Sequence, residues 1–177
     1  MACLLGVLGL TAYYFFTAAG PASTPPPDAL PPEADAAIQG FRLSGDRGDT
    51  TWDLTAETMA LYEDGNQARL RGVRLVVRAS GGREYTLTAE AGTMDMQTKN
   101  VEVWGQEQDV VIVTNDGYRF FSPRLYWNEK ERTVTTDEPI RLVGPQLEVR
   151  GRGLVVHVET QHVEILKDVR TRFRSAT

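Results

Sequence analysis

The sequence predicts an all-β protein, an antiparallel β-jelly roll or sandwich built from repeats and preceded by one N-terminal transmembrane helix. Three observations predict this class. The chain begins with an uncharged apolar run, a proline-rich segment follows, and apolar and polar residues alternate at period two from residue 36 onward. The predicted organisation is therefore a transmembrane anchor over 1–20, a proline-rich linker over 21–35 and a β domain over 36–177.

The first element is the apolar run. Residues 2–19 carry no charge, and a single membrane-spanning helix needs about twenty largely apolar residues. Four aromatic residues at 13–16 lie toward the end of the run, where the membrane interface is expected. A cleaved signal peptide is the alternative, because Ala18-Ala19-Gly20 resembles a cleavage site. Since Pro21 follows directly and no basic residue precedes the run, we expect an uncleaved anchor.

The second element is the linker. Residues 21–35 contain six of the nine prolines and no Lys or Arg. Such a composition favours an extended polyproline II segment, which would act as a semi-rigid spacer between the membrane and the next domain. Disorder between two domains is an equally good interpretation.

The β domain contains a fourfold repeat. Triplets of inward-facing candidates, two positions apart, start at Trp52, Tyr85, Tyr118 and Leu147, with spacings of 33, 33 and 29 residues. Each unit is predicted to form a strand, a turn, a second strand and another turn. One such unit has a single apolar face and cannot bury it alone, so successive units must stack. A further strand around 38–43 is expected to cap the first unit.

Each triplet ends on a small residue. These residues are Ala56, Ala89, Ser122 and Gly151. A small side chain inside a strand indicates a bend or a close approach of two backbones. Pro123 cannot donate a ladder hydrogen bond, so we expect a bulge or a sheet edge at that position.

The units share a motif that resembles a known family. The first half reads aromatic-x-Leu-x-Ala-Glu, as in WDLTAE from Trp52 and YTLTAE from Tyr85. The second half reads x-Val-x-Val-x-Gly, as in NVEVWG from Asn100. An N-terminal anchor followed by repeats of this form resembles the LptC family of the lipopolysaccharide export machinery, whose repeats are shared with LptA. The third and fourth units depart from the motif, with Ser-Pro and Gly-Arg in place of Ala-Glu.

The resemblance implies a role in lipopolysaccharide transport. A member of this family is expected to be a single-pass protein of the cell inner membrane with its C-terminal domain in the periplasm. It would receive lipopolysaccharide from an inner-membrane ABC transporter with subunits of the LptB, LptF and LptG type. It would pass the lipid to a periplasmic LptA-like bridge protein, and it would need no cofactor.

The inward-facing positions allow two interpretations. If the layers close, these residues form only a core, and if the layers splay along one edge, they form a groove that shields acyl chains from water. The resemblance favours a lipid-binding groove. Its predicted lining residues are Trp52, Leu54, Tyr85, Leu87, Val101, Val103, Phe120 and Val134.

The predicted last strand has a free edge, which is a template for a strand of another chain. By resemblance, this C-terminal edge would bind the LptA-like protein, through Val163, Ile165 and Val169. The membrane-near end would bind the periplasmic domains of the transporter.

Composition argues against other classes of protein. A single Cys excludes a disulfide framework and a Cys-based zinc site. After residue 35 the chain has 19 basic and 21 acidic residues, which excludes nucleic-acid binding driven by bulk charge. We interpret His157 and His162 as surface residues and expect neither a catalytic nor a metal site. The alternative function is a membrane-tethered structural β scaffold that binds only proteins.

Arginine dominates the basic residues. Sixteen of the 19 are Arg, and five lie between residues 69 and 83. Arg suits bidentate recognition of phosphates, which lipid A carries. Arginines on the polar face of a strand are the simpler interpretation.

Overall fold

The computed structural model describes residues 34, 36–62, 66–158, 160 and 162–173. The predicted anchor over 1–20 lies outside these residues, and so does the predicted linker over 21–35 except for Ala34. Within the described part of the chain, no helix is both long enough and apolar enough to cross a membrane.

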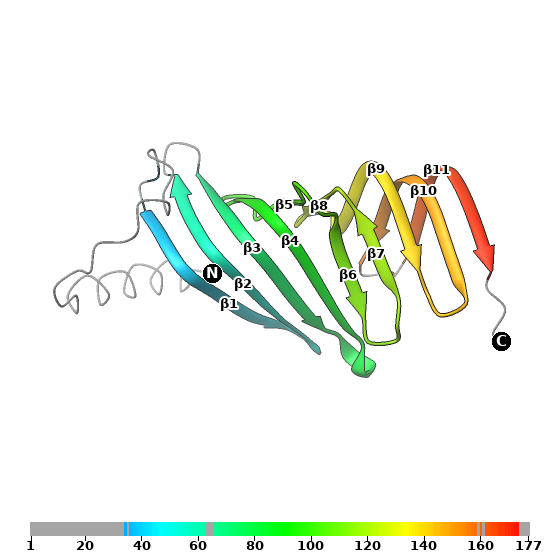
Figure 1. The fold of residues 1–177 in the computed structure, drawn as a ribbon. Coiled ribbons are helices and arrows are strands. Elements are labelled where there is room, and N and C mark those ends of the chain that lie inside the picture. Colours follow the sequence, from blue (N-terminus) through cyan, green and yellow to red (C-terminus); the bar gives the residue numbers. More distant parts are fainter. Residues whose placement is uncertain (1–33, 35, 63–65, 159, 161, 174–177) are drawn as a thin grey trace. The chain divides into compact units, whose positions relative to one another are not determined.

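The described residues form eleven β-strands, and all of their pairings are antiparallel (Figure 1). The predicted all-β, antiparallel class is therefore confirmed. The strands are β1 (Ala36–Arg47), β2 (Thr50–Tyr62), β3 (Gln67–Arg78), β4 (Glu84–Asp95), β5 (Val101–Trp104), β6 (Val110–Thr114), β7 (Arg119–Ser122), β8 (Arg124–Asn128), β9 (Thr133–Val143), β10 (Leu147–His157) and β11 (His162–Phe173). A 3₁₀ turn, η1 (Ser80–Gly82), joins β3 to β4.

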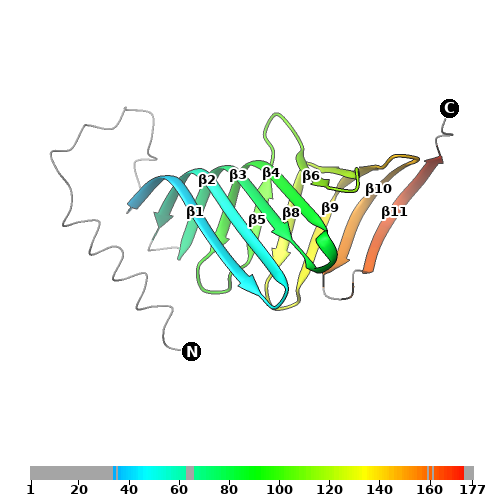
Figure 2. The ribbon, with the colours of Figure 1, turned by 90° about the horizontal axis from the view of Figure 1, so that it is seen from below.

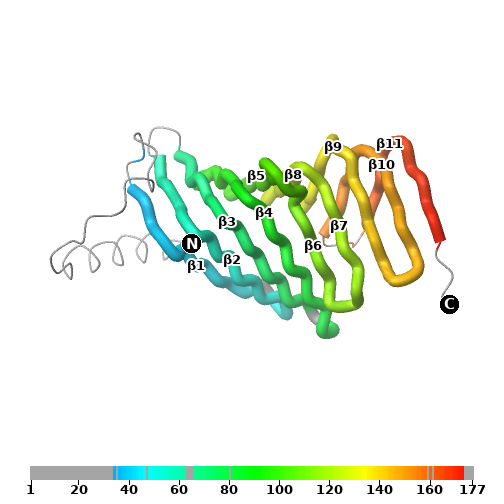
Figure 3. Tube along the Cα trace, viewed as in Figure 1, coloured from blue at the N-terminus to red at the C-terminus, as the bar shows by residue number. Residues whose placement is uncertain are grey.

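The repeat units predicted from the sequence match this strand order. The first triplet lies in β2, the second in β4, and the fourth in β10, while the third ends in β7. The capping strand expected around 38–43 is β1. Figure 3 follows the Cα trace through the successive hairpins.

The two layers of the fold belong to one continuous sheet that forks. The first half of β4, around Leu87, pairs with β6, whereas its second half, around Gly92, pairs with β5. The branches reunite at β9, which pairs with β8 near Val134 and with β7 near Leu142. The long strands thus run through both layers. Figure 2 shows the two layers one behind the other. This differs from two separate sheets, because here the backbone itself joins the layers.

The long strands bend where they pass from one layer to the other. Four residues within strands have positive φ angles, and these are Gly40, Gly72, Gly153 and Asp168. At Gly72, φ is +60°, and a Cβ atom there would lie 2.4 Å from Cδ of Glu57 on the neighbouring strand. Only glycine adopts this backbone conformation without strain, so the bend in β3 is encoded at that position.

Three of the small residues that end the triplets lie beside these positions. Ala56 pairs with Phe41 next to Gly40, Ala89 pairs with Val73 next to Gly72, and Gly151 lies two residues before Gly153. Gly151 shows the reason, because a Cβ there would lie 2.5 Å from Cγ2 of Ile165 and 3.1 Å from the carbonyl oxygen of Lys167. In the third unit, Ser122 is fully buried and Pro123 separates β7 from β8. Pro123, expected at a bulge or a sheet edge, thus lies between two strands and outside the ladder.

Between β5 and β6 the chain passes from one layer to the other through a loop instead of a bend within a strand. Residues 105–109 connect β5 to β6, and the carboxylate of Glu90 accepts hydrogen bonds from the backbone N–H groups of Gln106, Glu107 and Gln108. The Gly105 N–H donates to the carbonyl of Pro123 at 3.0 Å, which ties this loop to the gap between β7 and β8. The acidic residue of the repeat motif therefore anchors the point at which the sheet forks.

Candidate functional site

The apolar interior lies between the two layers. Its most buried members are Leu54, Ala56, Met59, Ala68, Leu70, Val73, Val103, Val110 and Leu125. They come from β2 and β3, which run through both layers, and from β5, β6 and β8 on the two branches. The interior is therefore one contiguous apolar cluster that both layers share.

Seven of the eight predicted groove residues belong to this cluster. Leu54 and Val103 are buried, and the others pack against the buried set while staying partly accessible. These others are Trp52, Leu87, Val101, Phe120 and Val134. The eighth, Tyr85, is partly buried on β4 and pairs with Val77 and Thr114, but it is not part of the cluster.

In the layer that contains β6 and β7, burial decreases from the bends toward the strand ends. Beside the bends, Leu70 is 2% exposed and Val110 is fully buried. Farther along the same strands, Leu75 and Ile112 are only partly buried. The layer that contains β5 and β8 is covered more evenly, because Ala68 and Leu125, each the second residue of its strand, are 1% and 2% exposed. The interior is thus sealed along the bends and less tightly covered at the strand ends of the β6–β7 layer.

The C-terminal edge is more apolar and more exposed than the sequence indicated. All three predicted partner-binding residues lie on β11, where Val163 is 57% and Val169 53% exposed, and Ile165 is partly buried. Phe173 at the end of the same strand is 80% exposed. Within the described residues β11 pairs only with β10, so its other side is a free edge.

The edge strand at the opposite end of the sheet, β1, also exposes apolar side chains, but fewer of them. β1 pairs only with β2 among the described strands, and Ile38 and Leu43 are each 42% exposed. Sequence reasoning missed these two residues as candidate contacts, although their alternation within the capping strand carried the signal.

The arginines concentrated in β3 lie on the outer side of the sheet rather than in its apolar interior. The Arg78 guanidinium pairs with Asp53 at 2.8 Å and with Glu84 at 3.1 Å, and the hydrogen bond to Asp53 raises the pKa of Arg78. Arg69 stacks on the Tyr62 ring with 4.5 Å to the ring centroid. These contacts are those of polar-face residues, which is the simpler of the two interpretations drawn from the sequence.

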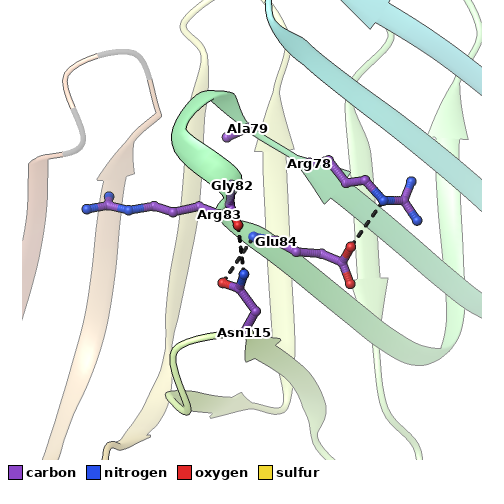
Figure 4. A pocket seen from close by; sticks show the side chains of 6 residues that line it. All are labelled: Arg78, Ala79, Gly82, Arg83, Glu84 and Asn115. Carbon is purple, nitrogen blue, oxygen red and sulfur yellow. Dashed lines mark hydrogen bonds and ion pairs between the residues drawn. The ribbon is translucent and has the colours of Figure 1, made fainter.

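A depression of about 230 Å³ lies at the β3–β4 turn and is lined by Arg78, Ala79, Gly82, Arg83, Glu84 and Asn115 (Figure 4). Asn115 spans it, because its Nδ2 donates to the Gly82 carbonyl at 2.7 Å and its Oδ1 accepts from the Glu84 N–H at 3.2 Å. The side-chain amide thereby ties the β3–β4 turn to the β6–β7 turn. We interpret this depression as a structural link between two turns.

Lowered carboxyl pKa values in the described part of the chain also have structural causes. Backbone N–H groups of Glu107 and Gln106 hold the pKa of Glu90 below its ordinary value, against a smaller opposing effect of burial. The Thr98 backbone N–H likewise lowers the pKa of Asp95 in the β4–β5 turn. No cluster of three or more His, Cys, Asp or Glu suited to a metal ion occurs among the described residues.

Among the described residues, an antiparallel β-sheet with a shared apolar interior and a free edge strand at each end defines a repeat-type β module. The sequence model of the family described as "Lipopolysaccharide-assembly, LptC-related" matches residues 1–174. The chain therefore belongs to the LptC family, as the repeat motif indicated. It has a role in lipopolysaccharide transport, as a transport component. The comparison with curated protein sequences found no match.

Proposed function

We propose that the chain is a membrane-anchored periplasmic component that receives lipopolysaccharide from an inner-membrane ABC transporter and passes it to an LptA-like bridge protein. The transporter would have subunits of the LptB, LptF and LptG type, and the anchor over 1–20 would cross the inner membrane once. The observation that carries the proposal is the gradient of burial in the β6–β7 layer of the apolar interior, from sealed bends to partly buried strand ends.

This gradient suits the acyl chains of a lipid. An acyl chain entering between the strand ends would contact partly buried side chains such as Trp52, Leu87 and Phe120 without displacing the buried residues at the bends. Removing a methylene from water contributes about 0.8 kcal/mol, so several chains provide a large driving force for entry. The same affinity opposes release, and onward movement must therefore be coupled to ATP hydrolysis by the transporter.

The two free edges suit the two partners. Strand addition at β11 would extend the sheet into the bridge protein through Val163, Ile165 and Val169, and would cover their exposed apolar surface. The edge at β1 follows the predicted linker directly, so it would lie at the membrane-near end and bind the periplasmic domains of the transporter.

Site-specific photocrosslinking tests the lipid path. A photoreactive amino acid at Leu87 or Phe120 would face the interior, whereas the same group at the next residue, Thr88 or Phe121, would face outward. We expect crosslinks to lipopolysaccharide from the interior positions that depend on ATP, and none from the two outward controls.

The alternative, a structural scaffold that binds only proteins, predicts a different result. Interior positions would then give protein crosslinks or none, while the protein still assembles with its partners. Equal lipid crosslinking from Thr88 and Leu87 would also contradict a path through the interior.

A further inference from the structure

The outer face of the C-terminal strands carries two adjacent rows of arginines. Cross-strand pairing places Phe121, Arg141, Arg150 and Arg170 side by side on β7, β9, β10 and β11. The next row contains Arg119, Val143, Glu148 and Arg172 on the same strands. These rows hold five arginines and one acid, and we refer to them as the arginine rows.

The arginine rows are only partly neutralised. Like charges directly opposite on neighbouring strands are destabilising, and Arg150 lies opposite both Arg141 and Arg170. Glu148, which is 6% exposed, accepts from Nε of Arg141 at 3.0 Å and from Nη2 of Arg150 at 2.8 Å. Among the described residues, Arg170 and Arg172 on the edge strand have no such carboxylate partner. The excess positive charge is therefore concentrated at the free edge.

The other face of the same edge is apolar. Val169 and Phe173, which alternate with Arg170 and Arg172, are 53% and 80% exposed. Natural edge strands often carry charges that discourage pairing, whereas a long edge with exposed apolar side chains favours association with another strand. β11 is thus an amphipathic strand with one side of its ladder unpaired, and a matching strand must complement both faces.

We propose that β11 binds a partner strand in which apolar residues alternate with Asp or Glu, the acidic side chains lying opposite Arg170 and Arg172. The inference rests on the proposed docking at this edge and adds the chemistry by which the partner is recognised. Backbone hydrogen bonds would continue the ladder, and the carboxylates would complete the charge pattern that Glu148 begins on β10. The planar guanidinium groups suit bidentate pairing with carboxylates.

A second copy of the chain fits this description less well. Its free edge, β1, presents Arg42, Ser44 and Asp46 on the outer face, and so brings one carboxylate and one further arginine to the rows. Charge complementarity therefore favours a different, acidic strand over head-to-tail self-association.

The test measures binding of the full-length chain, in detergent micelles, to the LptA-like protein of the same organism by biolayer interferometry over a series of NaCl concentrations. The variant is Arg170→Glu/Arg172→Glu. Its matched control is Arg71→Glu/Arg74→Glu, which makes the same charge change at exposed positions on the outer face of β3. We expect about tenfold weaker binding of the edge variant at low salt, a loss of its salt dependence, and no change for the control.

A partner variant with its two edge acids replaced by Lys should restore binding to Arg170→Glu/Arg172→Glu, which a merely structural role of the arginines would not produce. A third variant, Val169→Asp, separates this inference from the proposed docking. If Val169→Asp abolishes binding and the arginine variant binds like the wild type, the edge docks but the inference is wrong. If Val169→Asp binds like the wild type, the proposed docking fails, and the inference with it.

Flotation with phosphatidylglycerol vesicles tests whether the arginine rows bind lipid phosphates instead of the carboxylates of a protein strand. Loss of vesicle binding by Arg170→Glu/Arg172→Glu, with unchanged affinity for the protein partner, would assign the arginine rows to lipid phosphates and overturn the inference. Unchanged flotation together with weakened partner binding supports it.

Discussion

Replacing Gly72 with Ala tests whether the bends of the long strands are encoded by single residues. Gly72 has φ of +60° at the bend of β3, and its missing Cβ faces Glu57. A left-handed conformation costs a residue with a Cβ about 1–2 kcal/mol. The contact with Glu57 adds little, because that side chain is exposed and can move away.

We therefore expect Gly72→Ala to lower the free energy of unfolding by about 1–2 kcal/mol, which corresponds to a fall in the melting temperature of roughly 3–7 °C. Thermal unfolding followed by circular dichroism measures this change. Glu57→Ala/Gly72→Ala should unfold at the temperature of Gly72→Ala, since backbone strain and not the contact is the cause. Gly72→Asn should recover part of the loss, because Asn tolerates the left-handed region better than Ala.

A second glycine with positive φ separates the cost of backbone strain from the effect of its position in the fold. Gly81 has φ of +79° in the η1 turn, and a Cβ there would meet nothing within 4 Å. Gly81→Ala should therefore cost a similar free energy but leave lipid crosslinking at Leu87 unchanged, whereas Gly72→Ala should alter both. A melting temperature of Gly72→Ala equal to that of the wild type would refute the argument that this bend requires glycine.

Three further predictions follow from the contacts described above. Leu54→Ala removes a side chain that is 8% exposed in the cluster, and should lower the free energy of unfolding by about 2–4 kcal/mol in urea titrations, with a loss below 1 kcal/mol counting against this core. Glu90→Gln should flatten the pH dependence of stability. The lowered pKa of Glu90 means that its contribution is present above the ordinary pKa of about 4.5 and is lost as the pH falls through the folded-state value, so urea midpoints of wild type and variant should differ at pH 7 and converge in acid. Val169→Asp and Ile165→Pro should each prevent co-purification with the LptA-like protein while the chain stays in the membrane fraction, and normal co-purification would contradict docking at β11.

The sequence alone was informative about faces and bends. Period-two alternation identified the inner side of each strand, because the pleat repeats every two residues. The small residues at the ends of the triplets identified the bends, because a Cβ at Gly151 has no room beneath Ile165. These features depend on local geometry, which is why one sequence suffices to predict them.

The fork of the sheet and the arginine rows could not be predicted in this way. A period-two pattern says which face a residue occupies, but it does not say which strand lies beside it. The switch of β4 from β6 to β5 depends on the loop over 105–109, whose backbone is held by the carboxylate of Glu90, 16 to 18 residues earlier in the chain. The arginine rows require the register of four strands, with Arg119 and Arg172 more than 50 residues apart.

The forked sheet also explains how an apolar interior could admit lipid without unfolding. Among the described residues, the strand pairings run within each layer, and the layers are joined by the long strands on both sides of the fork, such as β4 and β9. Parting the strand ends would therefore break few ladder hydrogen bonds, and would cost chiefly the apolar contacts of partly buried residues such as Trp52 and Phe120. An entering acyl chain replaces those contacts at about 25 cal/mol per Å² of surface removed from water, so opening and filling nearly offset each other. The buried cluster stabilises the fold, and the partly buried strand ends of the β6–β7 layer are left to serve the proposed passage of lipid.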